Sequence, residues 1–331
     1  MKKLISFLGS IALVFATVSP GWAWGPDGHS TVGKIASLRI KQHTKDKIAG
    51  ILRPGETLAG IANWADTVKD RIGQHDSDSD TDEFLQDEEH NKNTRDWHFD
   101  DLPLGCTSYD TCEGFKPEAD VVHLINICIH TLQGQPDPNQ PLSERNALRM
   151  LVHLVGDLHQ PLHVGSGYIN VNGPNHSIVI ATDPALILQR HFPKDLGANL
   201  LMIDRQKNLH SFWDGDLVKA LMTATHKPTS DALATFLKSS VAPQPEWNGH
   251  GSVDTWAAEF ATDSLNQSRD HAYKSVMIVK SRVVTKNHKR QTVFDITRAS
   301  DYDSLNREEV RQQLAKGGFR LAKMLDEVFA H

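Results

Sequence analysis

Histidine and aspartate residues recur in this sequence at spacings that could coordinate a metal ion. Among the 18 histidines, His153 precedes Asp157 by four residues, and His210 precedes Asp214 by the same interval. Residues four apart project from one face of an α-helix. Imidazole nitrogen and carboxylate oxygen are the usual zinc donors where thiolate is absent. Either pair alone could be a hydrogen-bonded core pair, but their repetition favours metal binding.

Three further positions could join these pairs. Pro161 should end the helix that carries His153 and Asp157, which lets His163 turn back towards them. Asp66 lies in a helical pattern with Lys69 one turn further on, and His98 lies in the run Asp96-Trp97-His98-Phe99-Asp100-Asp101. Several His/Asp groupings in one helical chain are hard to explain as core packing alone.

The N-terminus has the pattern of a removable signal peptide. Lys2 and Lys3 precede an apolar run over 4–18, and the small-residue site Gly21-Trp22-Ala23 follows. A retained anchor helix is the alternative, but the run is short for a membrane span. We therefore expect residues 1–23 to be removed, and a secreted or periplasmic protein without stable membrane association.

Cleavage after Ala23 would leave Trp24 as the first residue. Its α-amine and carbonyl oxygen could chelate a metal ion, since a reference pKa near ~8 makes the neutral amine accessible. Gly25 and Gly28 would let the chain fold so that His29 reaches the same ion.

The chain is acidic overall. Its formal charge is -6, and loss of Lys2 and Lys3 leaves 33 basic against 41 acidic residues, or -8. Such a protein gains no general attraction for nucleic acid or anionic lipid. If it acts on phosphate esters, bound metal is the obvious source of positive charge.

The three cysteines do not have zinc-finger spacing. Cys106 and Cys112 flank a short loop and favour a disulfide in an exported protein, with two free thiols as the alternative. Cys128 lies in an apolar helical stretch and is expected to be a buried hydrophobe.

Helical periodicity dominates the chain and predicts a mainly α fold with few short strands, in one domain over 24–331. The acidic segment 74–93 is interpreted as a solvated loop, with a calcium site as the alternative, and 165–195 as a surface excursion. Helices are expected over 30–40, 44–52, 57–71, 119–132, 142–158, 211–224, 231–239, 253–275 and 307–330, and strands over 177–181, 200–203 and 277–284.

A known family shares this constellation. The motifs Trp24-Gly-x3-His29, Trp-Ala-Asp66, His98-Phe99, His153-x3-Asp157-x5-His163 and Asn-Leu-His210-x2-Trp-Asp214 resemble those of the zinc-dependent S1/P1-type nucleases, within the phospholipase C/P1 nuclease superfamily. The resemblance covers nearly the whole of 24–331 and implies a single compact helical domain.

The resemblance also implies three zinc ions (Zn2+). The first would be bound by Asp66, His98, His153 and Asp157, and the second by Trp24, His29 and a shared Asp157. The third would be bound by His163, His210 and Asp214.

The implied activity is hydrolysis of single-stranded DNA and RNA to 5′-nucleotides, with 3′-nucleotidase activity. A hydroxide held between the two ions that share Asp157 would attack phosphorus, with Asp66, Lys69 and Asp157 as catalytic residues. By resemblance, Phe99 would stack on a base and Asp101 would hydrogen-bond its edge. The alternatives are a core aromatic for Phe99 and a solvated charge for Lys69.

The sequence departs from the family after His163. A longer stretch intervenes, and Gly197-Ala198-Asn199 stands where the family has Gly-Gly-Asn, so the extra segment could shape substrate access. A zinc-dependent phospholipase C is one alternative, but the short gap from Trp24 to His29, Asp214 in place of Glu and the presence of Phe99 favour a nuclease. A non-enzymatic zinc carrier is another, although the ligands lie on predicted helices. We expect a monomer.

Overall fold

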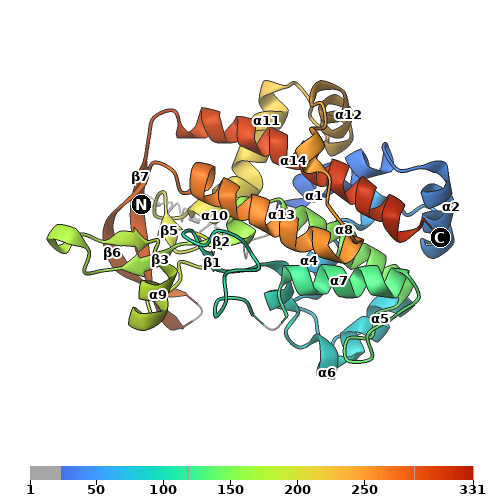
Figure 1. The fold of residues 1–331 in the computed structure, drawn as a ribbon, viewed down its shortest axis with the longest axis horizontal. Coiled ribbons are helices and arrows are strands. Elements are labelled where there is room, and N and C mark those ends of the chain that lie inside the picture. The colour runs from blue at the N-terminus through green and yellow to red at the C-terminus, as the bar shows by residue number, and fades with distance from the viewer. Residues whose placement is uncertain (1–23, 118, 287, 331) are drawn as a thin grey trace, which may run out of the picture.

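Helices make up most of the computed structural model, which describes residues 24–117, 119–286 and 288–330 (Figure 1). The expected signal peptide, residues 1–23, lies outside the described residues. No helix in the described part of the chain has both the length and the apolar character needed to span a bilayer. The longer helices are α1 (Pro26–Ser37), α2 (Gln42–Ile51), α7 (Val121–Leu132), α8 (Glu144–Leu158), α12 (Ser230–Ser240), α13 (Val253–Gln267) and α14 (Tyr302–Val328).

Helix α8 lies at the centre of the core. Ser143 caps it by accepting a hydrogen bond from the Asn146 N–H, and every residue from Arg145 to Leu158 is buried. Helices α1, α7, α13 and α14 pack around it. A helix buried on all sides is a rigid support for the side chains that it carries.

Helix α1 is held closely against α14. A Cβ on Gly318 of α14 would lie 2.4 Å from the Ile35 Cβ of α1, so only glycine permits this approach. The contact fixes α1, which carries His29, relative to the rest of the core.

Shorter helical segments connect these helices. They are α3 (Leu58–Ile61), α4 (Trp64–Val68), α5 (Ser79–Gln86), α6 (Glu88–Asn91), α9 (Pro184–Arg190), α10 (Leu209–Ser211) and α11 (Val218–Ala224), with 3₁₀ turns at Thr94–His98, Pro161–His163, Pro174–His176 and Pro245–Trp247 and π turns at Phe212–Leu217 and Ser268–Ala272.

Three small sheets complete the described fold. Strands β1 (Leu102–Pro103) and β2 (Gly165–Ser166) pair in parallel, and β3 (Tyr168–Asn170) pairs with β4 (Val179–Ala181) in antiparallel orientation. The third sheet has the order β5-β7-β6, formed by β5 (Leu201–Met202), β7 (Lys289–Arg298) and β6 (Val276–Lys286). The mainly α expectation is confirmed.

Several predicted boundaries were wrong. The expected helix over 57–71 is two short helices, α3 and α4, and the one over 253–275 ends at Gln267 before a π turn. Strand β7 was not predicted. Its alternating pattern is interrupted by the adjacent buried residues Val293 and Phe294, close to the point where β5 pairs with it.

The interpretation of 74–93 as a solvated loop was wrong. The segment forms α5 and α6, and two of its carboxylates, those of Asp78 and Asp80, are paired with arginines of the central helix. Arg145 contacts Asp78 at 2.8 Å and Asp80 at 2.7 Å, and Arg149 contacts Asp78 at 3.2 Å. The acidic residues therefore attach this segment to the core.

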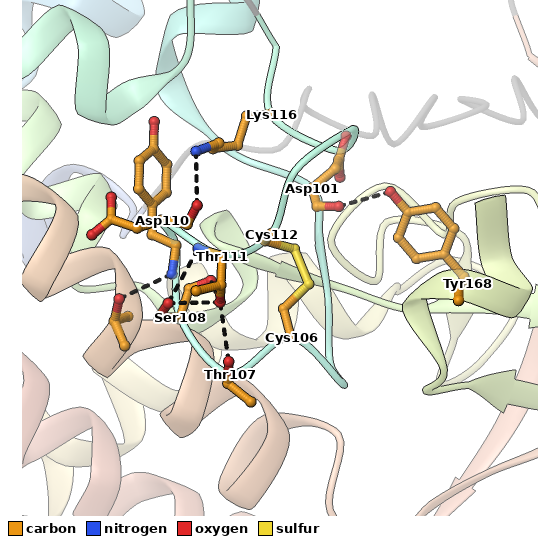
Figure 2. Close-up of a disulfide and its surroundings, with 12 residues drawn as sticks. Asp101, Cys106, Thr107, Ser108, Asp110, Thr111, Cys112, Lys116 and Tyr168 are labelled. Carbon is orange, nitrogen blue, oxygen red and sulfur yellow. Dashed lines mark hydrogen bonds between the residues drawn. A yellow bond between two sulfur atoms is a disulfide. The ribbon is translucent and has the colours of Figure 1, made fainter.

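Cys106 and Cys112 form a disulfide, and Cys128 is buried on α7, as expected. Figure 2 shows the disulfide in the loop that follows β1. Beside it, the Tyr168 hydroxyl donates a hydrogen bond to the main-chain carbonyl of Asp101 at 2.8 Å. Residues 165–195, expected as a surface excursion, supply this tyrosine and form β2, β3, β4 and α9.

Candidate metal centre

His153 and Asp157 of α8 form the middle of a buried cluster. The His153 Nε2 lies 3.2 Å from the Asp157 Oδ2, and the His98 Nδ1 lies 2.9 Å from the same oxygen. The two histidine nitrogens are 3.0 Å apart. Two imidazole nitrogens on one tetrahedral zinc would be about 3.3 Å apart, given bonds of roughly 2.0–2.1 Å. The observed spacing of the two nitrogens is therefore close to that of two ligands of one zinc ion.

His29 approaches Asp157 from helix α1. Its Nε2 lies 3.3 Å from the Asp157 Oδ1, and its ring stacks on His153 with centroids 4.0 Å apart. A Cβ on Gly156 would lie only 2.5 Å from the His29 Nδ1. Gly156 is thus required for the approach, a feature that our sequence reasoning missed.

Asp66 and Lys69 come from the α4 segment. Asp66, His29 and His153 offer ligand atoms within 4.8 Å of one another, as do His98, His153 and Asp157. Lys69 forms an ion pair with Asp66, and its side chain is only 11% exposed. The alternative of a solvated lysine is therefore wrong.

A third group is formed by His163, His210 and Asp214, whose ligand atoms also lie within 4.8 Å of one another. The His210 Nε2 is 3.4 Å from the Asp214 Oδ2. Asp214 lies in the π turn Phe212–Leu217 rather than in regular α-helix. Turns of this kind are often found at functional sites.

The third group depends on two contacts that the sequence did not reveal. The Gln160 side chain is buried and donates a hydrogen bond to the Asp214 Oδ1 at 2.7 Å. The pairing of β1 with β2 brings the segment after His98 beside the segment after His163, where the Asp100 N–H donates to the His163 carbonyl at 2.7 Å.

Main-chain carbonyls orient three of the imidazoles. The Nδ1 atoms of His153, His163 and His210 each donate to a carbonyl at 2.7 Å, those of Ala62, His98 and Gly197 respectively. A carbonyl can only accept, so the proton is on Nδ1 and the Nε2 lone pair is available to a metal.

Buried ligand atoms without hydrogen-bond partners support cation binding. A buried polar atom left unpaired is costly unless something else satisfies it. Among the described residues, such atoms include His29 Nε2, Asp66 Oδ2, Asp157 Oδ1, His163 Nε2 and Asp214 Oδ2. The donor set fits zinc, which takes imidazole nitrogen and carboxylate oxygen as ligands.

The charge states differ from group to group within the cluster, and those of Asp157 and His29 suit cation binding. Burial acts to lower the pKa of His153, but Asp157 and Asp66 outweigh this effect and that pKa is instead raised. Burial raises the pKa of Asp157, but His153, His29 and His98 outweigh it and hold that pKa well below its ordinary value. Burial lowers the pKa of His29, and His153 lowers it further. An ionised Asp157 and a neutral His29 are the forms in which these two groups bind a divalent cation.

Trp24 is buried beside the cluster. A Cβ on Gly28 would lie 2.6 Å from the Trp24 Cβ, so the glycine makes room for the indole. The Gly25 N–H donates to the Asp214 carbonyl at 2.8 Å, which ties the N-terminal segment to the third group.

A cavity of about 320 Å³ opens onto the metal-binding residues. Phe99 is only partly buried and lines it, which favours substrate contact over a core position. Its other lining residues include Lys69, Arg95, His98, Asp101, His163, His210 and Gln291. A cavity of this size could hold a small organic group, such as one nucleotide.

Asp101 does not present a free carboxylate to this cavity. Lys194, from the segment that departs from the family pattern, contacts its Oδ2 at 2.7 Å. Burial raises the pKa of Asp101, while Lys194 acts to lower it. The base-reading role expected for Asp101 would therefore have to compete with Lys194.

The known proteins that this chain resembles are nucleases. A model of the S1/P1 Nuclease family matches residues 24–330. The chain is 24% identical to Nuclease S1 of Aspergillus oryzae, with 95% of each chain covered. It is also 24% identical to Nuclease P1 of Penicillium citrinum, covering 92% of this chain and 97% of the relative. Endonuclease 4 of Arabidopsis thaliana is 21% identical over 99% of this chain and 97% of its own.

The family match and the His/Asp centre lead to the same conclusion. The chain belongs to the S1/P1 nuclease family and is a hydrolase that acts on phosphodiester bonds.

Proposed function

We propose that the protein hydrolyses single-stranded DNA and RNA to 5′-nucleotides, removes 3′-phosphates from nucleotides, and holds three zinc ions. The observation that carries this proposal is the orientation of Asp157. Its Oδ2 lies beside His98 and His153, and its Oδ1 faces His29 without a hydrogen-bond partner. A carboxylate with its two oxygens directed to different imidazole groups is suited to bridging two cations.

The assignment of ligands follows the three groups. Asp66, His98, His153 and Asp157 would hold one zinc ion, and His163, His210 and Asp214 another. His29 and Asp157 would hold the remaining ion together with the amine and carbonyl oxygen of Trp24. Bound zinc would lower the pKa of a water molecule near the phosphate and offset negative charge that develops in the reaction.

The other residues act on the substrate. Lys69, which pairs with Asp66 at the cavity wall, would hold a positive charge against the phosphoryl oxygens. Phe99 would stack on the base next to the scissile bond, an interaction that tolerates any base. The cavity would therefore select a flexible single strand rather than one sequence.

The second zinc ion makes N-terminal processing part of the proposal. Trp24 can supply an amine only if residues 1–23 are removed, which is consistent with an exported protein, secreted or periplasmic. The disulfide between Cys106 and Cys112 fits an oxidising compartment.

The test compares protein that begins at Trp24 with protein that retains Ala23. Release of acid-soluble nucleotides from single-stranded DNA and RNA is measured before chelation, after chelation and after zinc is restored. We expect activity to be lost on chelation and recovered with zinc. We also expect the Ala23 form to bind one fewer zinc ion and lose most of its activity.

Two outcomes would contradict parts of this proposal. Three zinc ions and full activity in the Ala23 form would exclude the N-terminal ligand. A zinc-loaded protein that begins at Trp24 but releases no nucleotide would exclude the nuclease assignment, and phosphatidylcholine would be the next substrate to assay.

A further inference from the structure

The β6–β7 hairpin concentrates positive charge in an acidic chain. Residues 276–298 contain one acidic residue, Asp295, against six basic ones, a net charge of +5 in a chain whose total is -6. The six basic residues are Lys280, Arg282, Lys286, Lys289, Arg290 and Arg298. The sequence pattern predicted only a strand over 277–284. The proposed function above does not use this positive charge.

The hairpin is attached to the wall of the candidate active-site cavity. The Phe294 N–H of β7 donates to the Leu200 carbonyl at 2.8 Å, next to β5. Leu200, next to β5, and Gln291, in β7, line the cavity together with Lys69 and Phe99. Figure 1 shows this hairpin at the end of the molecule opposite α2.

The strand register places cations on the face that carries Gln291. In an antiparallel pair, residues directly opposite each other share a face, and so do residues two apart on one strand. Arg282 lies opposite Val293, two residues from Gln291. Lys289 lies two residues from Gln291 in the other direction, about 7 Å further towards the tip.

The residues nearest the tip are the ones open to a ligand. Lys280 and Arg282 are partly neutralised by Asp295, at 3.6 Å and 2.8 Å. Lys289 and Arg290 are exposed, and neither is ion-paired with a described residue. Lys289 therefore lies beyond the cavity on the Gln291 face, and Arg290, the next residue, lies on the opposite face near the tip.

From this placement we propose that the β6–β7 hairpin is a docking arm for the sugar-phosphate backbone of a single-stranded polynucleotide. The inference rests on the proposed function and extends it to the length of the nucleic-acid strand that the enzyme binds. A strand with one nucleotide in the cavity would continue along the Gln291 face of the hairpin to Lys289, and Arg290, on the opposite face near the tip, would contact its phosphates where the strand passes over the end of the hairpin. Such contacts raise affinity without reading sequence.

A lipid surface is a weaker match for the same hairpin. Met277, Val279 and Val283 are 66%, 60% and 55% exposed, which could suggest apolar insertion. However, Met277 lies near the base of the hairpin, and Val283, on the face that carries Arg290, lies opposite Thr292 rather than at the tip. The apolar side chains are therefore not gathered at the tip with the cations.

The test uses the double variant Lys289→Ala/Arg290→Ala in the full enzyme. The matched control is Lys45→Ala/Lys47→Ala, which removes two exposed cations from α2 at the other end of the molecule. KM and kcat are measured on long oligothymidylate and on a thymidine dinucleotide across a salt series.

For the long strand we expect KM to rise about tenfold at low salt with kcat unchanged, and dinucleotide kinetics to match wild type. The slope of log KM against log salt should fall by about 1.4, because each lost phosphate contact removes about 0.7. The control should resemble wild type on both substrates.

Several outcomes would overturn the proposal. An unchanged KM for the long strand would do so, and so would equal losses on both substrates, which would indicate support of the cavity instead. Loss of binding to phosphatidylglycerol vesicles with an unchanged long-strand KM would indicate a lipid-binding role.

If wild type cleaves neither substrate, the proposed nuclease function fails separately. Fluorescence anisotropy with labelled oligothymidylate then tests the docking arm separately. The proposal requires the double variant to bind the strand more weakly than wild type does.

Discussion

Three histidines of the metal centre owe their orientation to the main chain, whereas Asp214 depends on a side chain. His153, His163 and His210 are each fixed by a carbonyl. Asp214 instead receives a hydrogen bond from Gln160, and burial raises its pKa well above the ordinary value. Without a cation, an ionised Asp214 would be costly to keep buried.

Gln160→Leu should therefore weaken metal binding at the third group. Leucine cannot donate to Asp214, and loss of such an orienting contact typically lowers metal affinity by about 10–100-fold. Zinc content after dialysis against graded chelator measures the effect. We expect one zinc ion to be lost at lower chelator concentration than in wild type.

Gln313→Leu is the matched control, because Gln313 is also buried and donates to Glu309 at 2.6 Å. Equal zinc retention in the two variants would show that Gln160 has no special role at the metal centre.

At the scale of elements, the turn at 195–199 connects the segment after His163 to the ligand His210. Leu196, Gly197 and Ala198 have successive positive φ values of 59°, 56° and 65°. The buried Asp195 stabilises this backbone, because its Oδ1 accepts hydrogen bonds from the Gly167 and Ala198 N–H groups at 3.0 Å and 2.9 Å. The turn places the Gly197 carbonyl against the His210 Nδ1.

Gly197→Ala should displace this turn. A Cβ there would lie 2.2 Å from the Leu162 carbonyl oxygen, a main-chain atom that cannot move aside easily. Positive φ adds strain for alanine, so we expect the free energy of unfolding to fall by at least about 1–3 kcal/mol. Urea denaturation measures this, and zinc content should fall in parallel.

The comparison variant is Gly50→Ala in helix α2, where an added Cβ meets nothing within 4 Å. Removing a helical glycine there should stabilise the protein by about 0.5–1 kcal/mol. If Gly197→Ala were as stable as wild type and kept its zinc, the turn would not be the support that we describe.

In the molecule as a whole, α8 carries His153 and Asp157 of the metal centre near its C-terminal end, and ion pairs fix its N-terminal end. Arg145 and Arg149, at the start of α8, bind Glu56 at the end of the α2–α3 connection and Asp78 before α5. These ion pairs attach peripheral segments to the helix that carries His153 and Asp157.

This network predicts acid sensitivity. Burial raises the pKa of Glu56, but Arg145, the Arg53 N–H and Arg149 outweigh it and lower the pKa to about 2. A carboxyl with a depressed folded-state pKa contributes stability above its unfolded value of 4.5. That contribution is lost as the pH falls from 4.5 towards about 2.

Glu56→Gln should reduce the dependence of Tm on pH within this window and lower Tm near neutral pH. Thermal denaturation of both proteins from pH 2 to 7 measures the difference, and comparison with wild type removes the shared effect of metal release in acid. Parallel Tm curves would show that Glu56 makes no such contribution.

The sequence by itself indicated the chemical groups and most of the helices. The four-residue spacings of His153 with Asp157 and of His210 with Asp214 follow from local helical geometry, which needs no tertiary information. The Cys106–Cys112 disulfide is similarly local. Even so, the π turn at Asp214 and the short helices α3 and α4 departed from simple periodicity.

Only the tertiary structure decided which groups meet. Gly156, Gln160 and Lys194 gave no signal at sequence level, because their roles depend on neighbours far along the chain. The acidic segment 74–93 was interpreted as solvated because two of its partners, Arg145 and Arg149, lie more than fifty residues away. Hydrophobic periodicity identifies the buried face of a single helix or strand, whereas a functional site forms where side chains from several elements come together.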